Sequence, residues 1–120
     1  MKNDLITPLT RWCEIDLDLL SHNINQAKKL ILPNTKIMAF LKDNAYGHGD
    51  ITIAHEMEHL GIDFFAVSHI DEAIRLRQNG IKSNILILSY TSPHYFELLS
   101  KYHLTQALIS LEYAQKLDSF

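Results

Sequence analysis

The stretch FLKDNAYGHGD, residues 40–50, contains the residue types best suited to chemistry in this sequence. Lys42 is the first polar residue after the apolar run KIMAFL (36–41), so we expect its amine to be partly desolvated. Partial burial favours the neutral amine, which is a nucleophile towards an aldehyde. Tyr46 follows four residues later, and the glycines on either side of His48 allow tight backbone turns. The spacing alone also fits an ordinary surface lysine followed by a turn, and by itself favours that simpler interpretation.

A second stretch, His-Glu-Met-Glu-His at residues 55–59, matches the H-E-x-x-H pattern of zinc proteases. The context differs from such a site, because the third ligand of the extended motif does not follow and a strand is predicted within five residues of His59. On a helical wheel the two histidines lie roughly opposite an apolar face. That face consists of Ile53, Ala54, Met57 and Leu60. We therefore expect His55 and His59 to face solvent and to bind no catalytic zinc.

The composition limits the classes of protein to which this chain can belong. With 120 residues, 47% of them hydrophobic, the chain is at most one compact domain or a piece of a larger one. A net charge of −3 gives no electrostatic basis for binding nucleic acid or an anionic membrane. No apolar run approaches the roughly 20 residues that span a bilayer, and we expect no secretory signal, because the N-terminus lacks its apolar h-region. The single cysteine, Cys13, cannot form an internal disulfide; we expect it to be buried, in a cytoplasmic protein.

Apolar runs and amphipathic segments alternate along the chain. Near-continuous apolar runs predict strands buried on both faces at 36–41, 63–68, 84–89 and 105–109. Helical patterns occupy 17–31, 50–61, 70–80, 92–102 and 111–120. Asp50 and Ser92 are expected N-caps, and Gly61 and Gly80 are expected to follow helix ends.

This alternation predicts right-handed βαβ units and a parallel sheet, either an open doubly wound sheet or part of a (β/α)₈ barrel. A whole barrel takes about 250 residues, so this chain would form about half of one. In both architectures Lys42 lies at the carboxyl end of a strand, where active sites form. Arg75 and Arg77 could bind phosphate, but their helix position favours a solvated face.

Four segments in order resemble the N-terminal part of alanine racemases: RWCEIDLDLLSHNI (11–24), KIMAFLKDNAYGHG (36–49), DFFAVSHIDEAIRLRQNGI (63–81) and NILIL (84–88). The resemblance implies an α/β fold in which residues 1–120 form the N-terminal half of a TIM-type (β/α)₈ barrel that binds pyridoxal 5′-phosphate. It also implies a homodimeric enzyme that interconverts L- and D-alanine and supplies D-alanine for peptidoglycan.

The resemblance assigns roles to individual residues. Lys42 would carry the cofactor covalently and act as the base on one face of the substrate, Tyr46 would bind the cofactor phosphate, and Leu88 would pack near the cofactor. In the family the second base is a tyrosine that the partner subunit supplies from a later domain. We therefore expect residues 1–120 alone to be inactive, and their open strand edges to favour self-association.

Two positions depart from the family pattern. Asp43 replaces the usual alanine, and its carboxylate could act on the Lys42 amine or point to solvent. Ser89 replaces a frequent glycine, which is closer to the racemase domains of vancomycin-resistance serine racemases. Serine is therefore an alternative substrate. A truncated non-catalytic remnant and a small binding module with an incidental lysine are the other hypotheses.

Overall fold

A computed structural model describes residues 11–120; the N-terminal stretch 1–10, where the absence of a secretory signal was inferred, lies outside the described residues. Four strands form one sheet in the order β1-β2-β3-β4, and every neighbouring pair is parallel. The strands are β1 (Ala39–Phe40), β2 (Phe64–Val67), β3 (Asn84–Ile87) and β4 (Thr105–Gln106). The predicted parallel α/β architecture, the N-terminal half of a TIM-type barrel, is confirmed.

Helical segments alternate with these strands. They are α1 (Leu17–Leu30), α2 (Lys42–Tyr46), α3 (Asp50–His59), α4 (Ile70–Gln78), the 3₁₀ turn η1 (Pro93–Tyr95), α5 (Phe96–Lys101) and α6 (Leu111–Asp118). None of the helices between residues 11 and 120 is long and apolar enough to cross a membrane.

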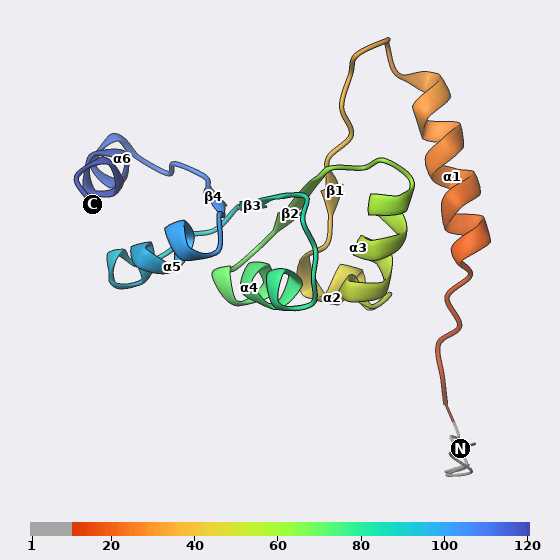
Figure 1. The fold of residues 1–120 in the computed structure, drawn as a ribbon, viewed down its shortest axis with the longest axis horizontal. Coiled ribbons are helices and arrows are strands. Elements are labelled where there is room, and N and C mark those ends of the chain that lie inside the picture. The colour runs from red at the N-terminus through yellow and green to blue at the C-terminus, as the bar shows by residue number, and fades with distance from the viewer. Residues whose placement is uncertain (1–10) are drawn as a thin grey trace.

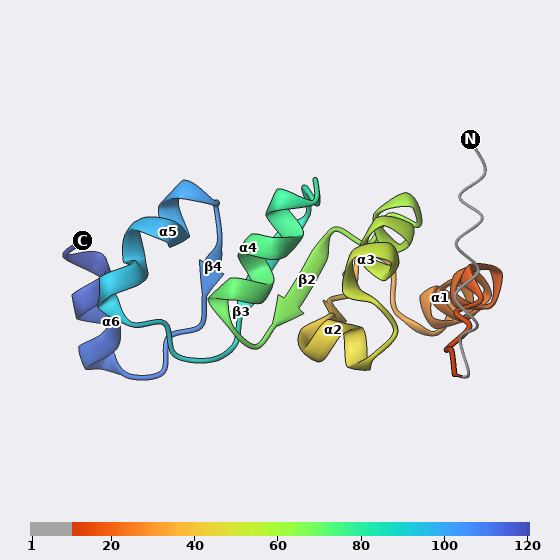
Figure 2. The same cartoon turned by 90° about the horizontal axis from the view of Figure 1, so that it is seen from below.

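The sheet is an open arc with helices along one side. Successive strands lie side by side across the molecule, and α4 and α5 lie on the same side of them (Figures 1 and 2). At the β1 end, α1 runs beside α3 (Figure 1). The radius of gyration is 17.3 Å, larger than the roughly 14 Å of a compact domain of this length. The excess follows from the extended arc.

The two faces of the sheet are buried to different degrees. One face, which contains Phe65 and Ile85, packs into the hydrophobic core with the helices. The other contains the row Phe40, Ala66 and Leu86, and Phe40 is 48% exposed. The expectation of burial on both faces is therefore wrong at β1. In a closed barrel this second face is filled by side chains from all eight strands, and four strands cannot fill it.

The helix ends were predicted with one error. Gly61 and Gly80 follow the ends of α3 and α4 with φ of 77° and 86°, as expected for left-handed C-terminal positions. Ser92 caps η1, which then leads into α5. Asp50, however, is the first residue of α3, and Gly49 is its N-cap. The Asp50 carboxylate accepts the adjacent Ile51 N–H and pairs with Arg75, but from the first helical position and not as the N-cap.

Cys13 was predicted to be buried, but it is exposed. It lies before α1, in a segment that adds little to the core. The prediction failed because the tendency of free cysteines to be buried acts only where the chain has a core to enter.

Candidate active site

Lys42 lies where the first strand of the sheet ends. The β1–β2–β3 register pairs Phe40 with Ala66 and Ala66 with Leu86. Hydrogen bonds beyond the strands, Leu41 N–H to Ala66 O at 2.8 Å and Leu88 N–H to Val67 O at 3.0 Å, continue this pairing. Extended by two residues, the register aligns Lys42 with Ser68 and Leu88 at the carboxyl edge of the sheet.

Lys42 and Leu88 are therefore two strands apart on one edge. Neighbouring strands are about 4.8 Å apart, which separates the two backbones by about 10 Å. The Lys42 side chain is 35% exposed, and Leu88 is half-buried. The expected partial desolvation of Lys42 is present, and the open face of the sheet lies between the two residues.

The chain after Lys42 forms a left-handed turn, residues 43–46, in which four consecutive residues have φ between 52° and 57°. Left-handed backbone costs L-residues roughly 1–2 kcal/mol each, less for aspartate and asparagine, whose side chains can bond locally. Gly49 N–H donates to Asn44 O at 2.9 Å, and His48 N–H to Ala45 O at 3.1 Å. Such strain persists only where the surroundings impose it.

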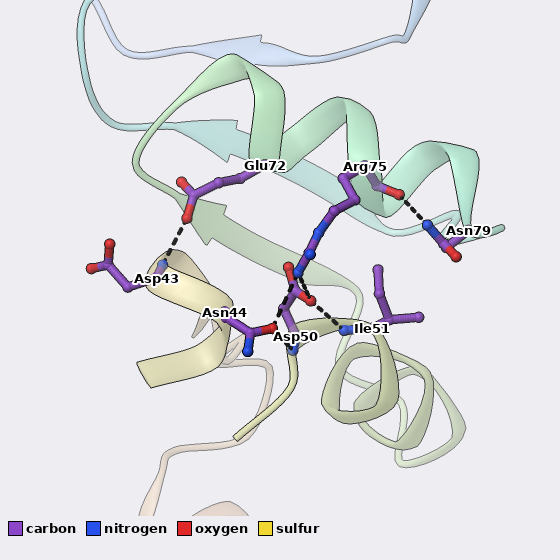
Figure 3. Close-up of polar contacts among 7 residues, drawn as sticks. All are labelled: Asp43, Asn44, Asp50, Ile51, Glu72, Arg75 and Asn79. Carbon is purple, nitrogen blue, oxygen red and sulfur yellow. Dashed lines mark hydrogen bonds and ion pairs between the residues drawn. The ribbon is translucent and has the colours of Figure 1, made fainter. Parts of the chain in front are cut away.

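Glu72 of α4 contacts the left-handed turn. Its Oε1 accepts the backbone N–H of Asp43 at 2.7 Å (Figure 3). Its Oε2 accepts the N–H groups of Ser68 at 2.8 Å and His69 at 2.9 Å, which lie between β2 and α4. One carboxylate therefore joins the segments that follow the first two strands.

Arg75, one helical turn after Glu72, bonds one side chain of the left-handed turn and one at the start of α3. Its Nη2 donates to Asn44 Oδ1 at 3.1 Å and forms an ion pair with the Asp50 carboxylate (Figure 3). The hydrogen bond with Asp50 raises the pKa of Arg75 above its ordinary value. Asp50 N–H also donates to Asn44 Oδ1, at 3.2 Å. The Asn44 side chain thus links the turn to α3 and α4.

Around the amine itself, two side chains of the turn approach. The Asp43 carboxylate lies 3.6 Å from Lys42 Nζ and is largely exposed, so it both contacts the amine and meets solvent. The Tyr46 ring centre lies 5.8 Å from Nζ, and Tyr46 is 60% exposed. An amine, a carboxylate and a phenol are thus grouped at one strand end.

A shallow pocket of about 200 Å³ lies beside the turn, lined mostly by apolar groups. Its walls are Leu20, Phe40, Ala45, Tyr46, His48, Ile53 and Met57. Phe40 and Tyr46 thus border both the pocket and the strand end that carries Lys42. The turn has apolar surface beside its polar groups.

The His-Glu-Met-Glu-His stretch lies on α3, and both of its histidines are exposed, as predicted. His55 Nε2 lies 3.0 Å from Asn79 O, and His59 Nδ1 lies 3.9 Å from Glu56 Oε2. Across residues 11–120, no group of three or more histidine, cysteine, aspartate or glutamate side chains is placed to hold a metal ion.

The prediction that the two arginines of α4 lie on a solvated face holds for Arg75, whose side chain is 51% exposed, and is wrong for Arg77, which is half-buried. Arg75 bonds Asp50 and Asn44, as described. Arg77 donates to four backbone carbonyl groups, and burial lowers its pKa. The acceptors are Tyr102 O, Ile81 O, Ser83 O and His103 O, at 2.7–3.1 Å. Sequence reasoning also missed Glu72, whose only signal was its place three residues after His69 in a capping-box pattern.

Together, the fold and this edge define a segment of a β/α barrel with a half-buried lysine at the carboxyl end of its first strand. The chain belongs to the alanine racemase family: the model of the alanine racemase N-terminal domain matches residues 15–120.

Individual relatives agree with this assignment. The chain is 47% identical over 113 residues to a serine/alanine racemase of Enterococcus gallinarum, covering 93% of this chain and 16% of that protein. It is 42% identical over 118 residues to alanine racemase 1 of Caldanaerobacter subterraneus subsp. tengcongensis, covering 98% and 30%. The solved alanine racemase of Clostridium difficile 630 superposes with a TM-score of 0.89 at 41% identity, covering 94% and 30%. The chain thus spans less than a third of the length of each of these relatives.

Proposed function

We propose that this protein is a pyridoxal-phosphate-dependent amino-acid racemase that interconverts L- and D-alanine. The observation that carries the proposal is the position of Lys42, a half-buried amine at the carboxyl end of β1. Two relatives over 40% identical are named as racemases of alanine or of serine and alanine. Residues outside this chain would supply the remainder of the site.

The residues at this edge fit the cofactor. Covalent attachment needs a primary amine that is accessible but partly desolvated, and the 35% exposed Lys42 side chain meets both conditions. Tyr46 would donate its exposed hydroxyl to the phosphate, and Leu88 would pack against the ring. Apolar surface for a flat ring is present on the same face, where Phe40 is half exposed.

In this proposal Lys42 has two roles. Its amine would hold the cofactor covalently, and once the substrate amine had taken its place, Lys42 would take or return the Cα proton on its own face. Bound pyridoxal phosphate supplies the electron sink that stabilises the negative charge at Cα. Inversion also needs a base on the opposite face. The family resemblance assigns that base to a tyrosine of the partner subunit, so the active form would be a homodimer, acting in the cytoplasm.

Serine is a second substrate to test. The relative with 47% identity is a serine/alanine racemase, and Ser89 follows Leu88 directly at the same strand end. Measuring exchange of both D/L pairs by the full-length protein would separate the two specificities.

The test of cofactor attachment is peptide mapping after borohydride reduction in the presence of pyridoxal phosphate. We expect the label on Lys42 and its loss in Lys42→Ala. A matched control is Lys36→Ala, because Lys36 is an exposed lysine before the other end of β1, where it pairs with Asp63. In this control the label on Lys42 should persist. Label on another lysine in the wild-type protein, or unchanged total labelling in Lys42→Ala, would contradict the assignment.

A further inference from the structure

The geometry points to Glu72 as a positioning residue for Lys42. Its carboxylate holds the left-handed turn against the end of β2 and so fixes the direction in which the Lys42 amine leaves the sheet. This inference rests on the proposed function of Lys42, but part of its test does not depend on the cofactor.

Both oxygens of Glu72 are used, and on different segments. Oε1 accepts the Asp43 N–H at 2.7 Å, and Oε2 accepts the Ser68 and His69 N–H groups at 2.8 and 2.9 Å. Because Asp43 directly follows Lys42, its peptide N–H belongs to the same peptide unit as the Lys42 carbonyl. Figure 3 shows the bond from this N–H to Glu72, and fixing the N–H therefore fixes the peptide plane that adjoins the Lys42 Cα.

The strained backbone explains why such a contact is needed. Residues 43–46 all have positive φ, and Ala45 and Tyr46 lack the short polar side chains that ease this conformation. A hydrogen bond to an ionised carboxylate is stronger than a neutral one. A contact of this kind at the first residue of the turn opposes its relaxation to ordinary backbone, which would carry Lys42 away from its place beside Ser68.

A helix cap alone would need only two of these three contacts. The bonds to Ser68 and His69 satisfy the orphan N–H groups before α4, which is the ordinary purpose of a glutamate at this position. The bond to Asp43 reaches the left-handed turn after β1 and adds nothing to α4. Both segments are bonded only if each of the two terminal atoms of the side chain accepts hydrogen bonds. Glutamine cannot do this, because its amide nitrogen is a donor.

The experiment compares Glu72→Gln with Asp71→Asn, a matched control on the same first helical turn whose side chain is exposed. The first readout is hydrogen exchange at the Asp43 amide of the full chain without cofactor. We expect exchange about tenfold faster in Glu72→Gln, equivalent to roughly 1.4 kcal/mol, and wild-type exchange in Asp71→Asn. Equal protection of this amide in wild type and Glu72→Gln would overturn the inference.

The second readout is the share of borohydride-fixed pyridoxal phosphate found on Lys42 relative to all other lysines. We expect this share to fall several-fold in Glu72→Gln and to stay constant in Asp71→Asn. Wild-type protein that is not labelled at Lys42 contradicts the proposed function, whereas equal Lys42 shares in wild type and Glu72→Gln contradict only the role of Glu72. If Glu72→Gln does not fold, Glu72→Asp keeps the charge but is one methylene shorter, and an unchanged Lys42 share in that variant would also overturn the inference.

Discussion

Asp50 and Arg75 form an ion pair in which the carboxylate is buried and the guanidinium is not: their side chains are 3% and 51% exposed. The Asp50 carboxylate also accepts the Ile51 N–H at 2.8 Å. Arg75 brings solvent-accessible charge to a carboxylate that has little contact with water. The pair joins the start of α3 to the middle of α4, next to the left-handed turn.

Removing Arg75 should destabilise the protein because it leaves a buried carboxylate without its partner. We expect Arg75→Ala to lower the free energy of unfolding by about 2–3 kcal/mol, less than the roughly 3–5 kcal/mol of fully buried pairs because Arg75 is half exposed. Asp50→Asn in the same chain should restore part of this loss, since no buried charge remains. Urea unfolding of the single and double variants measures both effects. Additive losses in the double variant would show that the two side chains are not coupled.

Glu58 should make stability depend on pH in the acidic range. Burial raises the pKa of Glu58, but hydrogen bonds from the Ser83 hydroxyl and from the Ser83 and Lys82 N–H groups outweigh it and lower the pKa below its ordinary value of 4.5. The folded state therefore favours the carboxylate, and the stabilisation is fully present above pH 4.5 and is lost as pH falls through the lower, folded pKa.

The measurement compares the free energies of unfolding of wild type and Glu58→Gln between about pH 7 and about pH 3. We expect wild type to be more stable at neutral pH and the difference to shrink in acid, where Glu58 becomes protonated. Glu97→Gln, on an exposed part of α5, serves as the control and should differ little from wild type at any pH. A difference between wild type and Glu58→Gln that is independent of pH would exclude this role.

The two histidines of the His-Glu-Met-Glu-His stretch should be dispensable. Because both side chains are exposed on α3, we expect His55→Ala with His59→Ala to change the free energy of unfolding by no more than about 1 kcal/mol, as for two surface substitutions. Chelator treatment should likewise leave the unfolding midpoint unchanged. Stoichiometric zinc in the purified protein that disappears in the double variant would show that this stretch is a metal site.

Residues 1–120, expressed alone and supplied with pyridoxal phosphate, should not racemise alanine or serine. The proposed base on the Lys42 face lies within these residues, whereas the family supplies the opposite base from a later domain. Chiral chromatography of the amino acid after incubation measures the exchange. Turnover in the range usual for enzymes, about 1–1000 per second, would mean that these residues contain a second base.

The sequence alone determined the alternation of elements and the position of the lysine. Near-continuous apolar runs identified all four strands, and glycines located the ends of α3 and α4. These signals are local: side-chain periodicity and the backbone freedom of glycine act within a few residues. The strands are shorter than predicted, since β1 pairs only at Ala39–Phe40, whereas the predicted strand starts three residues earlier at Lys36. Pairing depends on the neighbouring strand, which local pattern does not reveal.

The tertiary structure decided what surrounds Lys42. Glu72 lies 29 residues after Asp43 in sequence, and Arg75 lies 25 residues after Asp50, so no local pattern relates the members of either pair. They meet because parallel pairing of β1 with β2 brings the start of α4 beside the turn that follows Lys42. The left-handed conformation of residues 43–46 has the same origin. Intrinsic preference disfavours it at Ala45 and Tyr46, and it holds only where contacts from distant segments of the folded chain outweigh that preference.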